Sequence, residues 1–151
     1  MRILLIVVGQ LTTPGLRTLS DDFEQRLKHY TSLTIIEVKE AKGSVDEVLD
    51  AEASLIQKHI PDAANVYVLA LEGSPLSSLQ FATMVEAHQT YGSTPLVFII
   101  GGSDGLADSI KQQGKLLRVS TMTFPHQLMR VMFLEQLYRA FKIIRNEVYH
   151  K

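Results

Sequence analysis

Leu96-Val-Phe-Ile-Ile-Gly-Gly-Ser-Asp-Gly105 joins five apolar residues in a row to a turn that is rich in glycine. A strand that is covered on both faces of a parallel sheet shows such a continuous apolar run, whereas a half-exposed strand alternates. Further runs of this kind span residues 3–8, 34–38, 66–71 and, more weakly, 116–120. Together these runs predict a mostly parallel sheet.

Longer amphipathic stretches separate the apolar runs and predict helices. They span residues 15–30, 45–60, 78–90 and 106–113, and a long final helix is expected over residues 125–145. Gly73-Ser74-Pro75 is expected as a turn that ends the third strand. Strands that alternate with helices are typical of an α/β fold. Since the chain has no repeat or linker, we expect one domain over residues 1–151.

The composition narrows the class of protein and its location. The chain has no cysteine, which excludes disulfide bonds, cysteine nucleophiles and thiolate metal sites, and which fits the cytoplasm. The apolar run at the start is short, ends at Gly9 and lacks a small-residue cleavage site. No stretch reaches the roughly 20 apolar residues of a membrane span. We therefore expect a cytoplasmic protein that does not interact with a membrane.

Charge is unevenly distributed along the chain. The net charge is −1, but the residues from His126 onward carry five Lys/Arg against two Glu, which gives +3 and leaves −4 for the first 125 residues. A basic end on an acidic body permits a local phosphate-binding face, and a solvated helix face is the alternative.

Three loops are expected to meet at one edge of the sheet. In open α/β sheets, ligands bind beyond the carboxyl ends of the strands. The loops that follow predicted strands there span residues 69–74, 101–105 and 119–124, and two of them are rich in glycine or small hydroxyl residues. This pattern predicts a ligand pocket between the three loops.

The glycine turn matches neither common nucleotide-binding motif. Residues 101–105 form no Gly-x-Gly-x-x-Gly and no Gly-Lys-Ser/Thr, so a cofactor loop and a plain turn into a helix both stay open. Ser120-Thr-Met-Thr-Phe-Pro-His-Gln127 places hydroxyl groups and His126 at the start of the final helix. His126 is a candidate for proton transfer, with capping or packing as the alternative. No spacing of histidines and carboxylates indicates a metal site.

The final helix is apolar over more than one stripe. One side carries residues at helical spacing, namely Leu134, Leu137, Tyr138, Phe141 and Ile144. The first turns add apolar residues on other sides, namely Leu128, Met129, Val131 and Met132. The surplus apolar surface favours self-association, and complete burial within a monomer is the alternative. Glu135 and Arg139 are spaced for an i,i+4 ion pair.

Three blocks and the end of the chain are distinctive: Phe98-Ile-Ile-Gly-Gly-Ser-Asp-Gly-Leu106, Ser120-Thr-Met-Thr-Phe-Pro-His-Gln-Leu-Met-Arg-Val131, Glu135-Gln-Leu-Tyr-Arg-Ala-Phe-Lys-Ile143 and Tyr149-His150-Lys151. In these blocks, and over essentially its whole length, the chain resembles the RlmH family. These are small SPOUT-class methyltransferases that modify N3 of a pseudouridine in 23S rRNA. The resemblance implies an α/β knot, a trefoil near the C-terminus that ordinary chain topology would not predict. It also implies a homodimer, S-adenosyl-L-methionine (SAM) as methyl donor and S-adenosyl-L-homocysteine (SAH) as product.

The resemblance carries functional residues over by position. The cofactor contacts fall on the three loops, at Leu69, Gly101, Val119, Ser120, Thr121, Met122, Thr123 and Phe124, and Gly102 of the glycine turn is a further candidate. The candidates for catalysis are His126, Arg139, Tyr149 and His150. We expect the tail to close over the site, from its own chain or from the partner subunit. The resemblance implies 23S rRNA as the substrate, and because the body is acidic we expect it to be recognised within the large subunit or the intact ribosome rather than as free RNA.

The first cofactor loop departs from the family pattern. Many relatives carry an acidic residue where this chain has Ala70, and often a lysine where it has Ser74. Glu72 is the candidate to replace that carboxylate. Two other functions stay open: a SPOUT methyltransferase acting on another RNA such as tRNA, and a non-catalytic module that binds SAM or a nucleotide.

Overall fold

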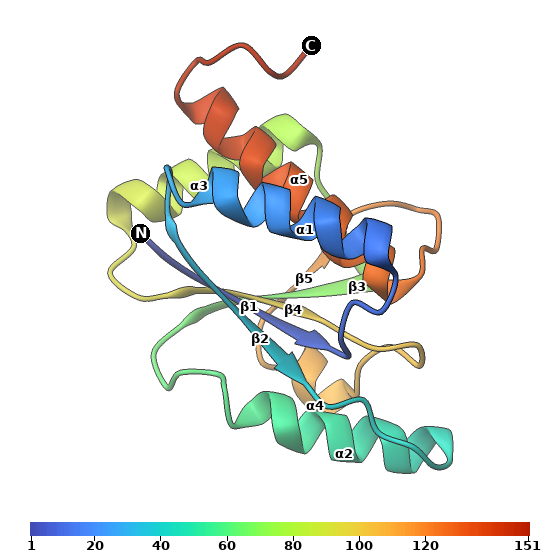
Figure 1. Ribbon diagram of the computed structural model, residues 1–151. Helices are drawn as coiled ribbons and strands as arrows, with labels where there is room; N and C mark the ends of the chain where they lie inside the picture. The colour runs from blue at the N-terminus through green and yellow to red at the C-terminus, as the bar shows by residue number, and fades with distance from the viewer.

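Five parallel strands form the centre of the molecule. The computed structural model describes residues 1–151 and orders the strands β2-β1-β4-β3-β5, with every neighbouring pair parallel (Figure 1). Their bounds are β1 (Arg2–Val8), β2 (Ser32–Val38), β3 (Asn65–Pro75), β4 (Leu96–Ile100) and β5 (Lys115–Arg118). Every residue of β4 is buried, as its continuous apolar run predicts. The predicted α/β fold with a mostly parallel sheet is confirmed.

Helices cover both faces of the sheet (Figure 1). One face is covered by α1 (Pro14–Leu27), α3 (Ser78–Tyr91) and α5 (His126–Ile144), and the other by α2 (Val45–Gln57) and the short α4 (Asp108–Lys111). The core under α1, α3 and α5 contains 17 buried residues and the core under α2 and α4 contains 11, so the larger one lies on the side of α5. None of these helices combines the length and the apolar character that a membrane span needs.

β3 is longer than the sequence suggests. The turn predicted at Gly73, Ser74 and Pro75 is wrong, because β3 continues through these residues and shifts its register with β5 between Leu69 and Ser74. The backbone of β5 packs directly on Gly73, where a Cβ atom would lie 2.7 Å from the backbone of Leu117. This bulge keeps the end of β3 along the edge strand and bends it locally.

α4 is shorter than predicted. The helix expected over residues 106–113 is reduced to Asp108–Lys111. Leu106 is buried in the core as part of the preceding loop, and Gly114 brings the chain back onto the backbone of Val66 in β3. The ends of the other four helices lie within three residues of the predicted ones.

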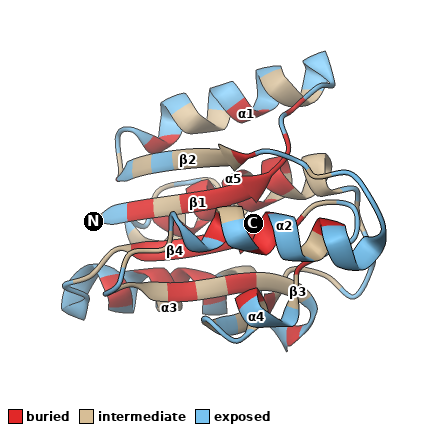
Figure 2. Cartoon of the chain, turned by 90° about the horizontal axis from the view of Figure 1, so that it is seen from below, coloured by how far each residue is buried: buried red, intermediate tan, exposed pale blue.

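α5 lies between α1 and α3 and is largely buried (Figure 2). Its buried residues are Arg130, Val131, Phe133, Leu134, Leu137, Tyr138, Ala140 and Phe141. Of the predicted stripe only Ile144 is not fully buried, and Phe133, outside that stripe, packs on Phe98 with ring centroids 4.6 Å apart. The chain itself therefore covers much of the surface that favoured self-association. Leu128, Met129 and Met132 stay half-buried.

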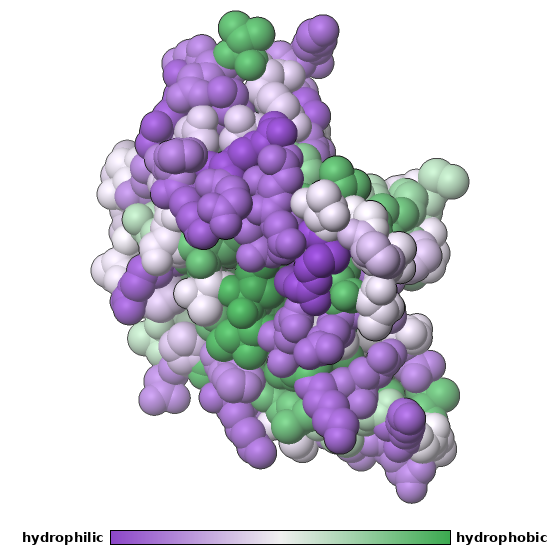
Figure 3. All heavy atoms as spheres, viewed as in Figure 1, coloured by the Kyte–Doolittle hydropathy of each residue, from purple (hydrophilic) through white to green (hydrophobic).

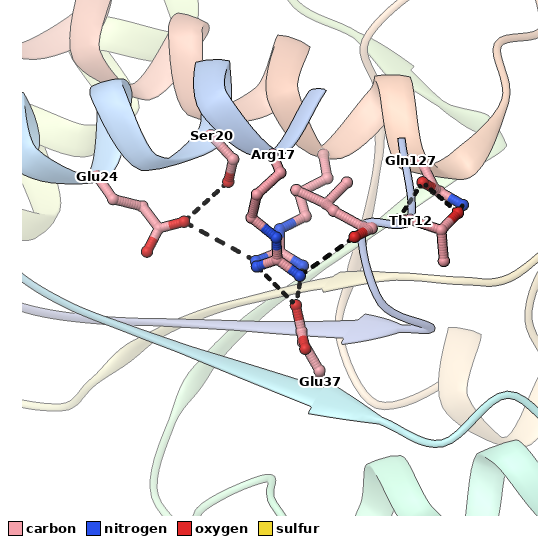
Figure 4. A network of polar contacts seen from close by, with 8 residues as sticks. Thr12, Arg17, Ser20, Glu24, Glu37 and Gln127 are labelled. Atoms are coloured by element: carbon pink, nitrogen blue, oxygen red, sulfur yellow. Dashed lines mark hydrogen bonds and ion pairs between the residues drawn. The ribbon is translucent and has the colours of Figure 1, made fainter. Parts of the chain in front are cut away.

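A network of ion pairs fixes the first turns of α5 (Figure 4). Arg130 is only 4% exposed; its Nη1 lies 2.5 Å from Oε1 of Glu37 on β2, and its Nη2 lies 3.8 Å from Oε1 of Glu24 on α1. Arg17 of α1 reaches the same Glu37 oxygen at 3.7 Å. A buried charge without a partner would be strongly destabilising. The network therefore holds the amino end of α5 against α1 and β2.

The edge strand β2 leaves some apolar surface open. Its Leu33, Ile35 and Ile36 are half-buried. Figure 3 shows apolar atoms gathered across the middle of this face, over the sheet between α1 and α2. Near the end of β2, Glu37 is paired with Arg17 and Arg130. Charged side chains on an edge strand disfavour its pairing with a strand of another molecule.

Candidate functional site

The carboxyl ends of the strands border a cavity of about 850 Å³. Its walls come from the end of β3, the glycine turn after β4 and the loop after β5. Eight of the nine residues predicted to bind the cofactor line it, namely Leu69, Gly101, Gly102, Val119, Ser120, Met122, Thr123 and Phe124; Thr121 does not. The three loops therefore meet at the predicted edge of the sheet, and their binding role stays a prediction.

The glycine turn after β4 has a backbone that disfavours any side chain. Gly105 has a φ of +83°, and its amide donates to the carbonyl of Gly102 at 3.1 Å. A Cβ atom on Gly101 would lie 2.7 Å from the carbonyl carbon of Gly105. Glycine tolerates both the positive φ and the close approach. The turn therefore presents mainly backbone to the cavity.

The loop after β5 offers unpaired backbone donors. The amide of Met122 donates to Oγ of Ser120 at 3.0 Å. The amides of Ser120, Thr121, Thr123 and Phe124 donate to no acceptor within the chain. Backbone amides are strong hydrogen-bond donors that need a partner. Their grouping beside the cavity suits a ligand that is held mostly through backbone groups.

An ion pair lies at the cavity wall near the end of β3. Nζ of Lys111 on α4 is 2.5 Å from Oε1 of Glu72, and both residues line the cavity. The hydrogen bond with Lys111 lowers the pKa of Glu72. Glu72, the candidate to replace the carboxylate missing at Ala70, is thus already engaged by a lysine of its own chain.

His126, the first residue of α5, lines the cavity. Its Nε2 faces the turn after β1: a Cβ atom on Gly9 would lie 3.4 Å from this nitrogen and 3.7 Å from Oε2 of Glu40. The next residue, Gln127, accepts a hydrogen bond from the amide of Thr12 at 2.9 Å, which ties the start of α5 to the same turn (Figure 4). His126 is the predicted catalytic residue that the structure places at the cavity.

A buried carboxylate that the sequence does not single out lies behind the glycine turn. Glu52 of α2 is 3% exposed, and its Oε1 accepts a hydrogen bond from the amide of Ala41 at 3.0 Å. A Cβ atom on Gly102 would lie 3.3 Å from its Oε2.

No group of three or more histidine, aspartate or glutamate side chains is arranged to hold a metal ion.

The other three predicted catalytic residues form what we call the C-terminal cluster, which consists of Glu135, Arg139, Tyr149 and His150. Nη2 of Arg139 lies 2.5 Å from Oε1 of Glu135, and the Tyr149 hydroxyl donates to the same oxygen at 3.0 Å. The Arg139 guanidinium is 4.8 Å from the centre of the Tyr149 ring and 3.4 Å from Nδ1 of His150. Burial, and then the hydrogen bond to Glu135, raise the pKa of Tyr149. None of these four residues lines the cavity at the carboxyl ends of the strands.

The tail returns along α5 because a second set of contacts holds it. Asn146 adopts a φ of +52° just after the helix ends. Glu147 accepts a hydrogen bond from the Tyr30 hydroxyl at 2.7 Å and forms an ion pair with Lys142. The hydrogen bonds from Lys142 and then Tyr30 lower the pKa of Glu147. The predicted tail residues are therefore docked on their own helix.

An apolar groove of about 490 Å³ adjoins both the C-terminal cluster and the cavity at the strand ends. Glu135 is part of its lining, and its apolar wall includes Phe23, Leu76, Val131 and Met132. Four residues line both the groove and the cavity, namely Leu117, Arg118, Val119 and Ser120. A group that occupied the groove would touch both parts of the predicted site.

A parallel α/β sheet with a cavity beyond the carboxyl ends of its strands is the architecture of enzymes that bind a nucleotide-like cofactor. A family model described as "Predicted SPOUT methyltransferase" matches residues 1–150, and the chain belongs to this family. It is 41% identical over 159 residues to "Ribosomal RNA large subunit methyltransferase H" of Clostridium botulinum (strain Langeland). It is 38% identical to the protein of the same name from Listeria monocytogenes serotype 4b. Both alignments cover 100% of this chain and 100% of the relative.

Solved structures share the fold at low sequence identity. A probable methyltransferase from Bordetella pertussis Tohama I has a TM-score of 0.60 at 9% identity, over 93% of this chain and 95% of that chain. A probable methylase family protein from Haemophilus influenzae Rd KW20 has a TM-score of 0.58 at 14% identity, over 99% of this chain and 70% of that chain. These likenesses and the family match confirm the SPOUT architecture. The trefoil knot stays a prediction.

Proposed function

We propose that this chain transfers a methyl group from SAM to N3 of a pseudouridine in 23S rRNA, within the large subunit or the intact ribosome. The observation that carries the proposal is the convergence of three strand-end loops on one cavity, which eight of the nine predicted cofactor residues line. The names of the full-length relatives favour rRNA over tRNA, and an enzyme over a plain binding module. A fold neighbour described by its methylation of tRNA is only 13% identical and supports the fold alone.

The cavity suits a ligand of the size and polarity of SAM. Its volume of about 850 Å³ falls within the roughly 300–1,000 Å³ of small-molecule sites. Leu69, Met122 and Phe124 line it and would cover the apolar faces of an adenine ring. The unpaired amides of the loop after β5 would bind polar edges of the cofactor.

The reaction needs a proton acceptor and an aligned base. SAM supplies an electrophilic methyl group on a cationic sulfur, so the protein has to orient the acceptor and remove the proton from N3. We assign proton removal to the His126 imidazole, because it lines the cavity. The raised pKa of Tyr149 makes its phenol a poor base near neutral pH. Arg139 would then stabilise the negative charge that develops on the base.

A homodimer would bring the C-terminal cluster to an acceptor in the cavity. Within one chain, Arg139, Tyr149 and His150 lie outside the cavity wall. The tail of one subunit would close over the cavity of its partner. The apolar groove between the cluster and the cavity supports this arrangement, since such grooves are commonly filled by a second copy.

The charge distribution supports rRNA within an assembled ribosomal particle, rather than free RNA, as the substrate. The first 125 residues carry −4 and the last 26 carry +3, so the chain as a whole has no excess of positive charge that would attract RNA phosphates. A protein with this balance binds free RNA weakly and relies on the shape of the ribosomal surface around the target base. We therefore propose that it acts in the cytoplasm, where ribosomes assemble.

The direct test is transfer of a labelled methyl group from SAM to four substrates: large subunits, intact ribosomes, naked 23S transcript and bulk tRNA. We expect label in 23S rRNA of the particles, in a nucleoside that mass spectrometry identifies as N3-methylpseudouridine. Equal or better labelling of tRNA, or SAM binding without transfer to any substrate, would overturn the proposal.

A further inference from the structure

Two charged side chains of opposite sign, Arg130 and Glu52, are buried, and only Arg130 forms an ion pair. Arg130 is paired with Glu37 at 2.5 Å, as a buried charge normally requires. Glu52 is 3% exposed and takes part in no ion pair of the chain. Its Oε1 accepts a hydrogen bond from the Ala41 amide, and both oxygens lie close to Gly102, where a Cβ atom would be 3.3 Å from Oε2 and 3.6 Å from Oε1. A buried carboxylate that forms no ion pair requires an explanation.

Two further carboxylates and one histidine act on the charge of Glu52. Burial is the largest effect and raises the pKa of Glu52, and the hydrogen bond from Ala41 lowers it. The carboxylates of Glu40 and Asp104 raise this pKa further, and His126 lowers it. Asp104 and His126 also line the cofactor cavity. Glu52 is therefore part of a negative region directly behind one wall of that cavity.

We propose that the Glu52 carboxylate makes the cavity prefer the cationic methyl donor over its neutral product. During transfer the bond from sulfur to the methyl carbon breaks, its electron pair stays on sulfur, and the methyl carbon bonds to N3. The sulfonium thus becomes a thioether, and the cofactor loses one positive charge. A negative charge behind Gly102 attracts the sulfonium and has no such effect on the thioether. The inference rests on the proposed function, because it requires SAM to bind in this cavity.

A purely structural role for Glu52 explains less. The Ala41 amide needs only an acceptor, which a glutamine would provide without the cost of burying a charge. Glutamine would also avoid the repulsion from Glu40 and Asp104. Burial of the carboxylate therefore lowers the stability of the ligand-free protein. A cation bound in the cavity would offset that free-energy cost.

The test compares the affinities of three ligands by calorimetry on the full chain. SAM carries the sulfonium, SAH lacks the charge, and sinefungin keeps a positive charge on an amine without a transferable methyl. The key variant is Glu52→Gln, which keeps an acceptor for Ala41, and Glu52→Asp retains the charge as a second variant. Asp50→Asn removes a charge from an exposed position of the same helix and is the matched control. Circular dichroism and thermal melts check that each variant folds.

We expect Glu52→Gln to weaken SAM and sinefungin by about fivefold or more, with little change for SAH. Asp50→Asn should behave as wild type, and Glu52→Asp should keep most of the preference. The inference is wrong if Glu52→Gln keeps the wild-type ratio of SAM to SAH affinity, or if it weakens all three ligands equally. If the wild type binds none of the three, the proposed function itself fails.

Discussion

The cavity at the strand ends and the C-terminal cluster differ in how much of each site a single chain supplies. The cavity draws on the ends of β3, β4 and β5 within one chain, and all three of its walls are present. The C-terminal cluster brings Arg139, Tyr149 and His150 together around Glu135, yet none of them reaches the cavity. This difference suggests that one chain suffices to bind the cofactor, whereas catalysis needs the tail of a second chain.

Removing the tail should distinguish the roles of the two regions most strongly, because it should reduce methyl transfer without weakening SAM binding. We expect deletion of residues 148–151 to lower methyl transfer to ribosomes by about 100-fold or more, as for loss of positioned catalytic groups. SAM affinity should stay within about twofold, because the deleted residues do not line the cavity. Labelled-methyl transfer and calorimetry measure the two quantities. Deletion of Lys151 alone is the control, and near-normal transfer by the longer deletion would show that the tail is dispensable.

Filling the cavity should have the opposite effect. Ala70 lines the cavity, so Ala70→Trp should weaken SAM by about tenfold or more through overpacking, while leaving the C-terminal cluster intact. Ala51→Trp is the matched control, since Ala51 is exposed on α2. Calorimetry with SAM measures the affinity, and thermal melts should show both variants folded. Unchanged SAM affinity in Ala70→Trp would place the cofactor elsewhere.

Loosening the cluster without removing it should give a smaller effect. Glu135→Gln removes the charge that holds the Arg139 guanidinium and receives the Tyr149 hydroxyl. We expect the turnover number to fall by about tenfold with SAM affinity unchanged. Glu86→Gln, at an exposed position of α3, is the control for loss of one negative charge. A drop in SAM affinity as large as the drop in turnover would link Glu135 to the cavity instead.

Acid should release the tail from its docked position on α5. The hydrogen bonds from Lys142 and Tyr30 lower the pKa of Glu147 from its ordinary value of 4.5. Because the pKa is lower in the docked state, this contact stabilises docking above pH 4.5 and is lost as the pH falls through the lowered value. Hydrogen exchange of the tail amides between pH 6 and 3, corrected for intrinsic rates, should show this loss. Glu147→Gln should remove the pH dependence, and an identical profile in that variant would contradict the assignment.

The sequence predicted the layers and the cavity because both depend on local patterns. Continuous apolar runs identify buried parallel strands, and the strand-end rule then selects the loops without any knowledge of packing. The continuation of β3 through Gly73 was not predictable, because it depends on the backbone of β5 lying against that glycine. The same holds for the short α4, whose end is set by the contact of Gly114 with β3.

The parts of the site that the sequence missed are those set by tertiary contacts. Glu52 lies on an amphipathic helix, and helical spacing alone does not distinguish a buried glutamate behind a ligand loop from one at the surface. The position of Tyr149 against α5 depends on the αL conformation of Asn146 and on the contact of Glu147 with Tyr30. The contacts of Glu52 with Gly102 and of Glu147 with Tyr30 each join residues that are far apart in the sequence, so no local sequence pattern predicts them.

A mixing experiment tests most directly whether one chain provides the cavity and another the tail. SAM is kept well below its wild-type Kd, so that Ala70→Trp, which keeps its tail, is expected to reach only about a tenth of the wild-type rate. The chain that lacks residues 148–151, which keeps its cavity, is expected to be nearly inactive. They are mixed under conditions that exchange subunits, and labelled-methyl transfer to ribosomes is measured. If the tail acts across a dimer, random mixing restores about a quarter of the wild-type rate, since half of the dimers then contain one complete site. A mixture that stays as inactive as its two components, although its subunits have exchanged, would contradict the account.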